Sequence, residues 1–262
     1  MNSPLLIVRD TTVSVSEAGK RKTLIDKVSF QIPALSIMAL VGESGSGKTT
    51  TGFSILRLLA TGLEVDSGTV IFEGKNLLSL SEDQMRPIRG GKISMVFQEP
   101  LNAFNPVFTI GYQVDEVMRF HTKLSRPQRQ ERILELFNLV GLSDPRRMAG
   151  SYPHQLSGGM RQRAMIAQAI AANPKLIIAD EPTSNLDVTL QARIIELFQK
   201  LKDELSLSIL LITHDLGMVG HVADEMAVMS RGKIIECGPT KEVLNNPREE
   251  YTKQLMNAFE VS

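Results

Sequence analysis

Residues 42–49, Gly-Glu-Ser-Gly-Ser-Gly-Lys-Thr, directly follow the apolar run 37–41 and match the pattern G-x-x-x-x-G-K-[ST]. We call them the phosphate loop. Such a loop needs glycine, because its backbone N–H groups must converge on phosphate oxygens in conformations that a Cβ would obstruct. The next segment, 50–56, can open a helix whose positive N-terminal end faces the anion. Strand, loop and helix in this order predict a binding site for a nucleoside triphosphate.

The loop pattern also assigns roles to its polar side chains. Lys48 is expected to reach the β- and γ-phosphates, and the Thr49 hydroxyl to ligate Mg²⁺. The residues expected to bind the nucleotide are Gly42, Glu43, Ser44, Gly45, Ser46, Gly47, Lys48, Thr49 and Thr50.

Composition narrows the possible partners. The 262 residues include 29 Lys plus Arg and 29 Asp plus Glu, so no net charge favours a nucleic acid or an anionic membrane. Cys237 is the single cysteine, which excludes an internal disulfide and favours a reducing cytosol. No signal sequence is recognised at residues 1–9, and no run approaches the roughly 18 to 20 apolar residues of a membrane span. Membrane contact is therefore expected only through partner proteins.

Hydrophobic periodicity predicts strands that alternate with helices, which favours a parallel α/β sheet. A small β layer is expected to precede the phosphate loop, with strands in 5–15 and 23–33 and a turn, strand and turn over 66–74. Further strands are expected over 92–97, 175–179 and 208–213. Helices are expected within 112–142, broken at Pro127, then from 156–160 onward, over 190–205 and over 241–245, with a loosely packed end.

Two adjacent acidic residues stand at the end of a predicted apolar strand. Asp180 and Glu181 follow residues 176–179, and adjacent residues at a strand end point in different directions. Asp180 suits Mg²⁺ coordination, while Glu181 suits activation of the attacking water as a general base. The alternative for an isolated Asp-Glu pair is a solvated strand end.

Residues 156–162, Leu-Ser-Gly-Gly-Met-Arg-Gln, form what we call the signature segment. Ser157 can cap the helix that follows, and Gly158 and Gly159 expose N–H groups, which makes a second anion site. One nucleotide has no need of two such helix ends, unless the second serves a nucleotide held by another subunit. The alternative is a plain helix cap with turn glycines.

Six such segments occur in a fixed order: 42–49, Gln98 after 96–97, 156–162, 180–181, 184–187 and 213–215. With these residues in this order, essentially the whole chain resembles the nucleotide-binding subunit of an ABC transporter. The resemblance implies an α/β fold, with a P-loop NTPase core, a small antiparallel β layer and a helical subdomain. It implies one domain over 1–262, with β layer and RecA-like core over 1–98 and 160–235, helical subdomain over 99–159 and tail over 236–262.

The resemblance also implies residue roles. Gln98 would link the metal and attacking water to the membrane partner, and His214 would contact the γ-phosphate, although a lone histidine is more often an ordinary strand-end residue. Asp187 would lie across the subunit interface. The expected catalytic residues are Glu181, His214, Gln98 and Lys48; the expected metal ligands are Thr49, Gln98 and Asp180. The residues expected at the partner's ATP are Ser157, Gly158, Gly159, Gln162 and Asp187.

Within the family, segments 98–111, 157–163 and 186–193 resemble the oligopeptide, dipeptide and nickel importers. That implies two permease subunits, a second related ATPase or a second copy of this chain, and an extracytoplasmic substrate-binding protein, with this subunit at the cytoplasmic face of the membrane.

The chain departs from the group's pattern in four places. It has no cysteine-rich segment for an iron–sulfur cluster, and it has Glu249-Glu250 where histidine and proline are common. Val15 stands where an aromatic residue usually stacks on adenine, which puts nucleotide selectivity in doubt. Leu35 stands where glycine is usual, which we interpret as a local change of turn.

The predicted function is an ATPase that drives import of peptides, nickel or a metal chelate. ATP would be sandwiched between one subunit's phosphate loop and the other's signature segment, and residues 102–118 would offer a groove to a permease helix. Phe104, Phe108 and Tyr112 in that stretch are more often core than contact residues. Two alternatives are a soluble ABC ATPase without a membrane partner and a non-catalytic ATP-binding module, which the presence of Glu181 disfavours.

Overall fold

The computed structural model describes residues 4–17, 20–184 and 186–260. The chain packs into two compact units, one formed by the described residues of Met1–Met85 and Ser206–Ser262, the other by those of Arg86–Leu205. Each unit combines strands and helices, as the α/β prediction required. None of the helices among the described residues has the length and hydropathy of a membrane span.

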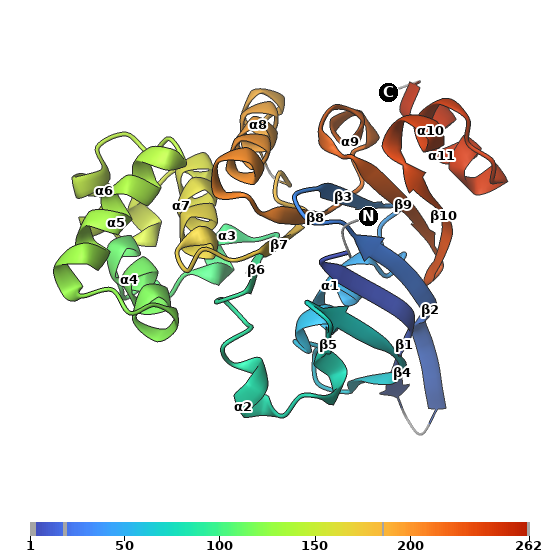
Figure 1. Cartoon of the computed structure of the whole chain (residues 1–262). Coiled ribbons are helices and arrows are strands. Elements are labelled where there is room, and N and C mark those ends of the chain that lie inside the picture. The colour runs from blue at the N-terminus through green and yellow to red at the C-terminus, as the bar shows by residue number, and fades with distance from the viewer. Residues whose placement is uncertain (1–3, 18–19, 185, 261–262) are drawn as a thin grey trace. The chain divides into compact units, whose positions relative to one another are not determined.

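An antiparallel sheet in the first unit confirms the predicted β layer. Its strand order is β2-β1-β4-β5, visible in Figure 1. Side chains of β2 alternate toward its end between exposed and buried, as expected when one sheet face packs on a core. The strands are β1 (Leu6–Glu17), β2 (Lys20–Ile32), β4 (Leu63–Phe72) and β5 (Lys75–Asn76).

The turn predicted at the start of residues 66–74 is wrong. Residues 66–72 continue β4, whereas the second predicted turn is confirmed at residues 73–74. The pairing of β1 with β4 shifts register between Arg9 and Val13. Gly68 takes φ 102° there, and a Cβ on it would lie 2.7 Å from the carbonyl oxygen of Asp10. The glycine therefore marks a β-bulge inside a strand instead of a turn between strands.

Buried parallel strands carry the phosphate loop. In the first unit β3 pairs in parallel with β8 on one side and β9 on the other, and β10 pairs antiparallel with β9. Every residue of β3 and β8 is buried, as in a sheet covered on both faces. These strands are β3 (Ile37–Val41), β8 (Ser208–Thr213), β9 (Glu225–Ser230) and β10 (Lys233–Pro239). The helices of this unit are α1 (Lys48–Leu56), 3₁₀ helix η1 (Leu77–Ser79), α2 (Glu82–Met85), α9 (Leu216–Val222), α10 (Thr240–Asn245) and α11 (Glu250–Glu260).

The C-terminal end differs from the prediction. A second helix, α11, follows α10 and contacts α9 and β10. Its Thr252 is fully buried. The expectation of a loosely packed end is therefore wrong for the described residues.

The second unit is mainly helical. Strands β6 and β7 pair in parallel, helix α7 packs on β6, and α4, α5, α6 and α7 pack together (Figure 1). The predicted helix break lies before Pro127, which sits in the first turn of α5, where its missing N–H is tolerated. The elements are β6 (Ile93–Val96), α3 (Pro100–Ala103), α4 (Ile110–His121), α5 (Arg126–Leu139), α6 (Pro145–Gly150), 3₁₀ helix η2 (Pro153–Gln155), α7 (Gly158–Ile170), β7 (Leu176–Asp180) and α8 (Val188–Leu205).

The predicted subdomain boundaries at 98, 159 and 235 follow the family's organisation and stay a prediction. The two compact units divide the chain elsewhere, after Met85 and after Leu205.

Candidate active site

The phosphate loop runs from the end of β3 to the start of α1 in a conformation that requires glycine. Gly42 takes φ 149°, and a Cβ there would lie 2.1 Å from the carbonyl oxygen of Met229. Gly47, the N-cap residue of α1, takes φ 105°, and its Cβ would lie 2.8 Å from Cγ2 of Ile25. Any larger side chain at either position would push the loop away from β9 or β2, so the two glycines fix its path.

Two buried polar groups of the loop suit a phosphate. The Nζ of Lys48, a residue only 4% exposed, donates to the carbonyl oxygens of Gly42 and Glu43, each at 2.8 Å. The Oγ of Ser46 is buried and has no hydrogen-bond partner among the described residues. An unsatisfied buried hydroxyl costs about 1–3 kcal/mol. A phosphate oxygen would satisfy it, so the loop's chemistry fits the triphosphate of ATP.

His214 lies at the same sheet edge as the phosphate loop. Val41, the last residue of β3, is paired with Thr213, the last residue of β8. Because the strands are parallel, the loop and His214 leave the sheet on the same side. His214 is exposed, and Asp215 caps helix α9 by accepting from the amide of Met218 at 3.0 Å. The first unit therefore brings the histidine and the loop to one edge.

The acidic pair and Gln98 meet in the same manner in the second unit. Val96 of β6 is paired with Ala179 of β7, so Gln98 and Glu181 follow at one edge. The Nε2 of Gln98 donates to Oε2 of Glu181 at 3.0 Å. Asp180 is 3% exposed, whereas Glu181 is half-buried and takes φ 43°. This left-handed backbone is costly for a non-glycine residue. The two carboxylates differ in exposure, and their predicted opposite directions stay a prediction.

Ser184 begins the predicted segment 184–187, but the sequence analysis gave it no role in the site. Its Oγ lies 2.9 Å from the carbonyl oxygen of Glu181 and 3.3 Å from that of Gln98. The single hydroxyl hydrogen is donated to the nearer carbonyl of Glu181 or shared with that of Gln98, so Ser184 lies between the two backbones. A serine three residues after Glu181 is the signal that could have revealed this, because Ser side chains often hydrogen-bond to nearby backbone groups.

The signature segment opens α7 as predicted. The Ser157 hydroxyl caps the helix, accepting from the amide of Met160 at 3.3 Å, and both Ser157 and Gly158 are exposed. Gln162 is 2% exposed, and its Nε2 has no hydrogen-bond partner within the described residues. Asp187 is exposed and accepts from the amide of Leu190 at 2.9 Å at the start of α8. Asn185, within the predicted segment 184–187, lies outside the described residues.

The predicted Mg²⁺ ligands provide oxygen atoms of the kind this hard cation prefers. Thr49, a hydroxyl in the first turn of α1, belongs to the first unit, whereas Gln98 and Asp180 belong to the second. Their donor chemistry fits the ion.

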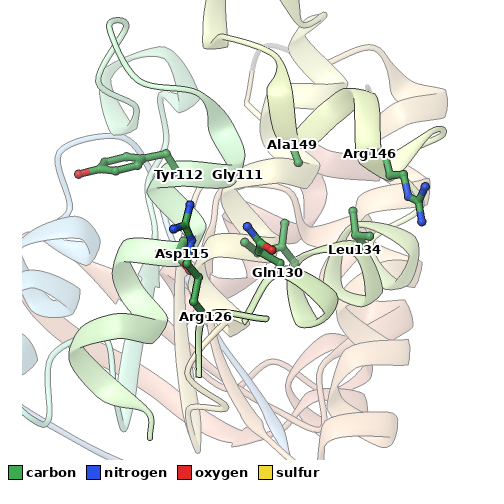
Figure 2. Close-up of a pocket in the computed structure, with 9 residues that line it drawn as sticks. Gly111, Tyr112, Asp115, Arg126, Gln130, Leu134, Arg146 and Ala149 are labelled. Atoms are coloured by element: carbon green, nitrogen blue, oxygen red, sulfur yellow. The ribbon is translucent and has the colours of Figure 1, made fainter. Parts of the chain in front are cut away.

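Helices α4, α5 and α6 enclose a surface cavity of about 380 Å³ (Figure 2). Asp115 on one wall is paired with Arg129, whose Nε lies 2.7 Å from Oδ1. Next to the cavity, Phe108 stacks on Tyr112 with ring centroids 4.8 Å apart, and each is 42% exposed, whereas Phe104 is buried. The lining residues are Gly111, Tyr112, Asp115, Arg126, Gln130, Ile133, Leu134, Arg146 and Ala149.

Curated relatives align with nearly the whole length of this chain. It is 46% identical over 262 residues to a putative peptide import ATP-binding protein of Brucella ovis, covering 98% of this chain and 78% of the relative. It is 45% identical over 253 residues to the oligopeptide transport ATP-binding protein OppD of Bacillus subtilis, covering 96% and 71%. It is 46% identical over 256 residues to the peptidoglycan transport ATP-binding protein YejF of Agrobacterium fabrum, covering 97% of this chain but spanning only 47% of that relative.

Solved structures and a family's sequence pattern also match this chain. The ATP-binding cassette MJ0796, solved as a dimer in a post-hydrolysis state bound to ADP and Pi, matches with a TM-score of 0.80 and 27% identity, covering 90% of this chain and 98% of that one. The fold of cbiO1 from Clostridium perfringens matches with a TM-score of 0.79 and 24% identity, covering 94% and 92%. The sequence pattern of the family described as ABC transporter matches residues 25–184. The chain therefore belongs to the ABC transporter family, as its resemblance predicted, and membership of that family implies that it binds ATP.

Proposed function

We propose that this family member is the ATP-hydrolysing subunit of a peptide importer. The observation that carries hydrolysis is the pairing of Glu181 with Gln98 at the end of two buried parallel strands. The names of the three relatives above support a peptide-containing cargo, and none of them mentions the nickel that the resemblance left open.

In the proposed reaction, Glu181 accepts a proton from the water that attacks the γ-phosphate. Gln98 fixes the orientation of the glutamate side chain by donating to one of its oxygens. Lys48 and the amide groups at the start of α1 stabilise charge on the phosphates, and His214 contacts the γ-phosphate. A bound Mg²⁺, held by Thr49, Gln98 and Asp180, would neutralise phosphate charge.

The signature segment acts, in this proposal, on ATP held by another subunit. Support comes from the exposure of Ser157 and Gly158 at the start of a 13-residue helix, where N–H groups attract an anion. Asp187, also exposed, would lie at the same subunit interface. The dimeric state of MJ0796 is a property of that protein and makes the arrangement reasonable here. The second subunit would be a related ATPase or a second copy of this chain.

The permease is proposed to dock on the second unit, beside the cavity between α4, α5 and α6. Stacked Phe108 and Tyr112 together with Val107, which is 68% exposed, supply neighbouring exposed apolar side chains that a permease helix could cover. Two permease subunits would hold the ATPase at the cytoplasmic face of the membrane, and an extracytoplasmic binding protein would deliver the peptide. No nucleic acid takes part.

The test is co-purification of the tagged full-length chain from detergent-solubilised membranes of its native cell, followed by mass spectrometry. We expect to recover two permeases and a binding protein. A second ATPase would also be recovered if the chain pairs with a related subunit, and no other ATPase if it pairs with a second copy of itself. Addition of peptides to the reconstituted complex should then stimulate ATP hydrolysis. Recovery of soluble partners alone would favour the alternative, an ABC ATPase without a membrane partner.

A further inference from the structure

The C-terminal helix α11 is fixed to the strand before it by a carboxylate. Glu236 of β10 accepts hydrogen bonds from the amides of Arg248, at 3.0 Å, and Glu249, at 3.2 Å. These amides belong to the segment that leads into α11, so the side chain of Glu236 determines where the helix begins.

The same helix packs against a buried cluster to which the strand before the phosphate loop contributes. Tyr251, Leu255 and Met256 of α11 contact a buried cluster that includes Ala39 and Val41 of β3. Val41 is the residue directly before the loop. Because Tyr251 and Leu255 are four residues apart, both lie on the face of α11 that packs against this cluster.

Tyr251 also reaches the loop itself. Its hydroxyl oxygen accepts a long hydrogen bond, 3.5 Å, from the amide of Glu43. The carbonyl oxygen of Glu43 accepts from Nζ of Lys48 at 2.8 Å and from the amide of Ser46 at 3.2 Å. Glu43 therefore connects the C-terminal helix to the lysine and to the serine that suit a phosphate.

We propose that Tyr251 is a positioning residue for the phosphate loop, so that nucleotide affinity depends on the docking of α11. The Glu43 side chain is exposed, so its packing does little to hold the peptide that joins Gly42 to Glu43. Tyr251 orients the N–H of the peptide that joins Gly42 to Glu43, and the same peptide presents the carbonyl oxygen of Gly42 to Nζ of Lys48 at 2.8 Å. The inference rests on the proposed assignment of residues 42–49 as the nucleotide site.

The test compares the full-length chain with Tyr251→Phe, which removes one hydroxyl and keeps the ring in its packing. Titration with a fluorescent ATP analogue and Mg²⁺ should give a Kd raised by up to about 10-fold, the limit set by complete loss of one neutral hydrogen bond. The matched control is Tyr152→Phe, which removes a hydroxyl from an exposed tyrosine of the other unit and should leave the Kd unchanged.

Hydrogen exchange separates positioning from a loss of stability. In Tyr251→Phe without nucleotide, the Glu43 amide should exchange faster while the amides of β8 exchange as in the wild type. An unchanged Kd in Tyr251→Phe would overturn the inference, and so would equally faster amide exchange throughout the first unit. The proposed function would still stand as long as the wild-type chain bound Mg-ATP. A wild-type chain that bound no Mg-ATP would overturn both.

Discussion

The carboxamide of Gln98 donates a 3.0 Å hydrogen bond to the carboxylate of Glu181, although 83 residues separate them in sequence. Parallel pairing of β6 with β7 places both at one end of the strands, and Glu181 takes a positive φ of 43° there. The backbone at this position costs about 1–3 kcal/mol, which is typical of sites where orientation matters to the chemistry.

Substitution of this glutamate should separate ATP binding from hydrolysis. Glu181→Gln keeps an oxygen that accepts from Gln98 but removes the base, so hydrolysis by the assembled transporter should fall about 10²- to 10⁴-fold. Mg-ATP binding should persist. Phosphate release measures the change, and Glu204→Gln, at a half-exposed position of α8, is the control. Wild-type turnover in Glu181→Gln would remove this residue from the base role.

Removal of the loop lysine should abolish tight nucleotide binding. Lys48→Ala deletes charge-assisted hydrogen bonds to phosphate worth roughly 1.5–3 kcal/mol each, so the Kd for Mg-ATP should rise about 10- to 1000-fold. Equilibrium titration measures it, with Lys241→Ala at an exposed position as the control. A variant that bound ATP normally would contradict the assignment of the phosphate loop.

A bulky cation at the signature segment should affect the other subunit's nucleotide. Ser157→Arg is expected to spare ATP binding by this chain and to block turnover at the site it shares with its partner. Because the Ser157 hydroxyl caps α7, the substitution also costs about 1 kcal/mol of helix stability, and Ser157→Ala isolates that cost. Single-turnover measurements on the complex distinguish the sites; turnover at both would count against the shared-site proposal.

Local signals in the sequence predicted much of the fold. The fully buried strands β3 and β8 coincide with apolar runs in the sequence. The serine and glycine at 157 and 158 correctly predicted where α7 begins. Gly68 was misinterpreted because a turn and a β-bulge use the same conformational freedom, and only the partner strand distinguishes them.

Longer-range relationships could not be predicted locally. The contact of Tyr251 with Glu43 joins residues 208 positions apart, and no periodicity reveals it. The family's order of motifs named Gln98 and Glu181, but their hydrogen bond follows from strand register.

A strained leucine offers a test of backbone energetics. Leu35 takes φ 60°, where glycine is favoured, and is 58% exposed, so its side chain contributes little burial. Leu35→Gly should relieve about 1–2 kcal/mol of strain, offset in part by the chain entropy of glycine, and raise the free energy of unfolding by about 0.5–1 kcal/mol. Urea unfolding measures it. Leu58→Gly, at a position without positive φ, should lower that free energy, and a loss in Leu35→Gly would refute the strain argument.

Docking of α11 should depend on pH through Glu236. Burial alone would raise the pKa of this carboxyl, but the amides of Arg248 and Glu249 and the Arg248 charge favour its ionised form, and its pKa is lowered overall from 4.5. A pKa lower in the folded than in the unfolded state stabilises the fold fully above the unfolded value, and that contribution is lost as pH falls through the folded value.

The stability difference between wild type and Glu236→Gln should therefore be constant above about pH 6 and shrink as pH falls below 4.5. Urea unfolding over this range measures the difference, and a gap that stayed constant into strong acid would show that ionisation of Glu236 does not hold α11.

At neutral pH the Glu236→Gln variant should also weaken Mg-ATP binding, as expected for Tyr251→Phe, because both changes loosen the connection from α11 to Glu43. Weaker nucleotide binding in Tyr251→Phe but not in Glu236→Gln would confine the effect to the tyrosine hydroxyl and separate it from docking of the helix.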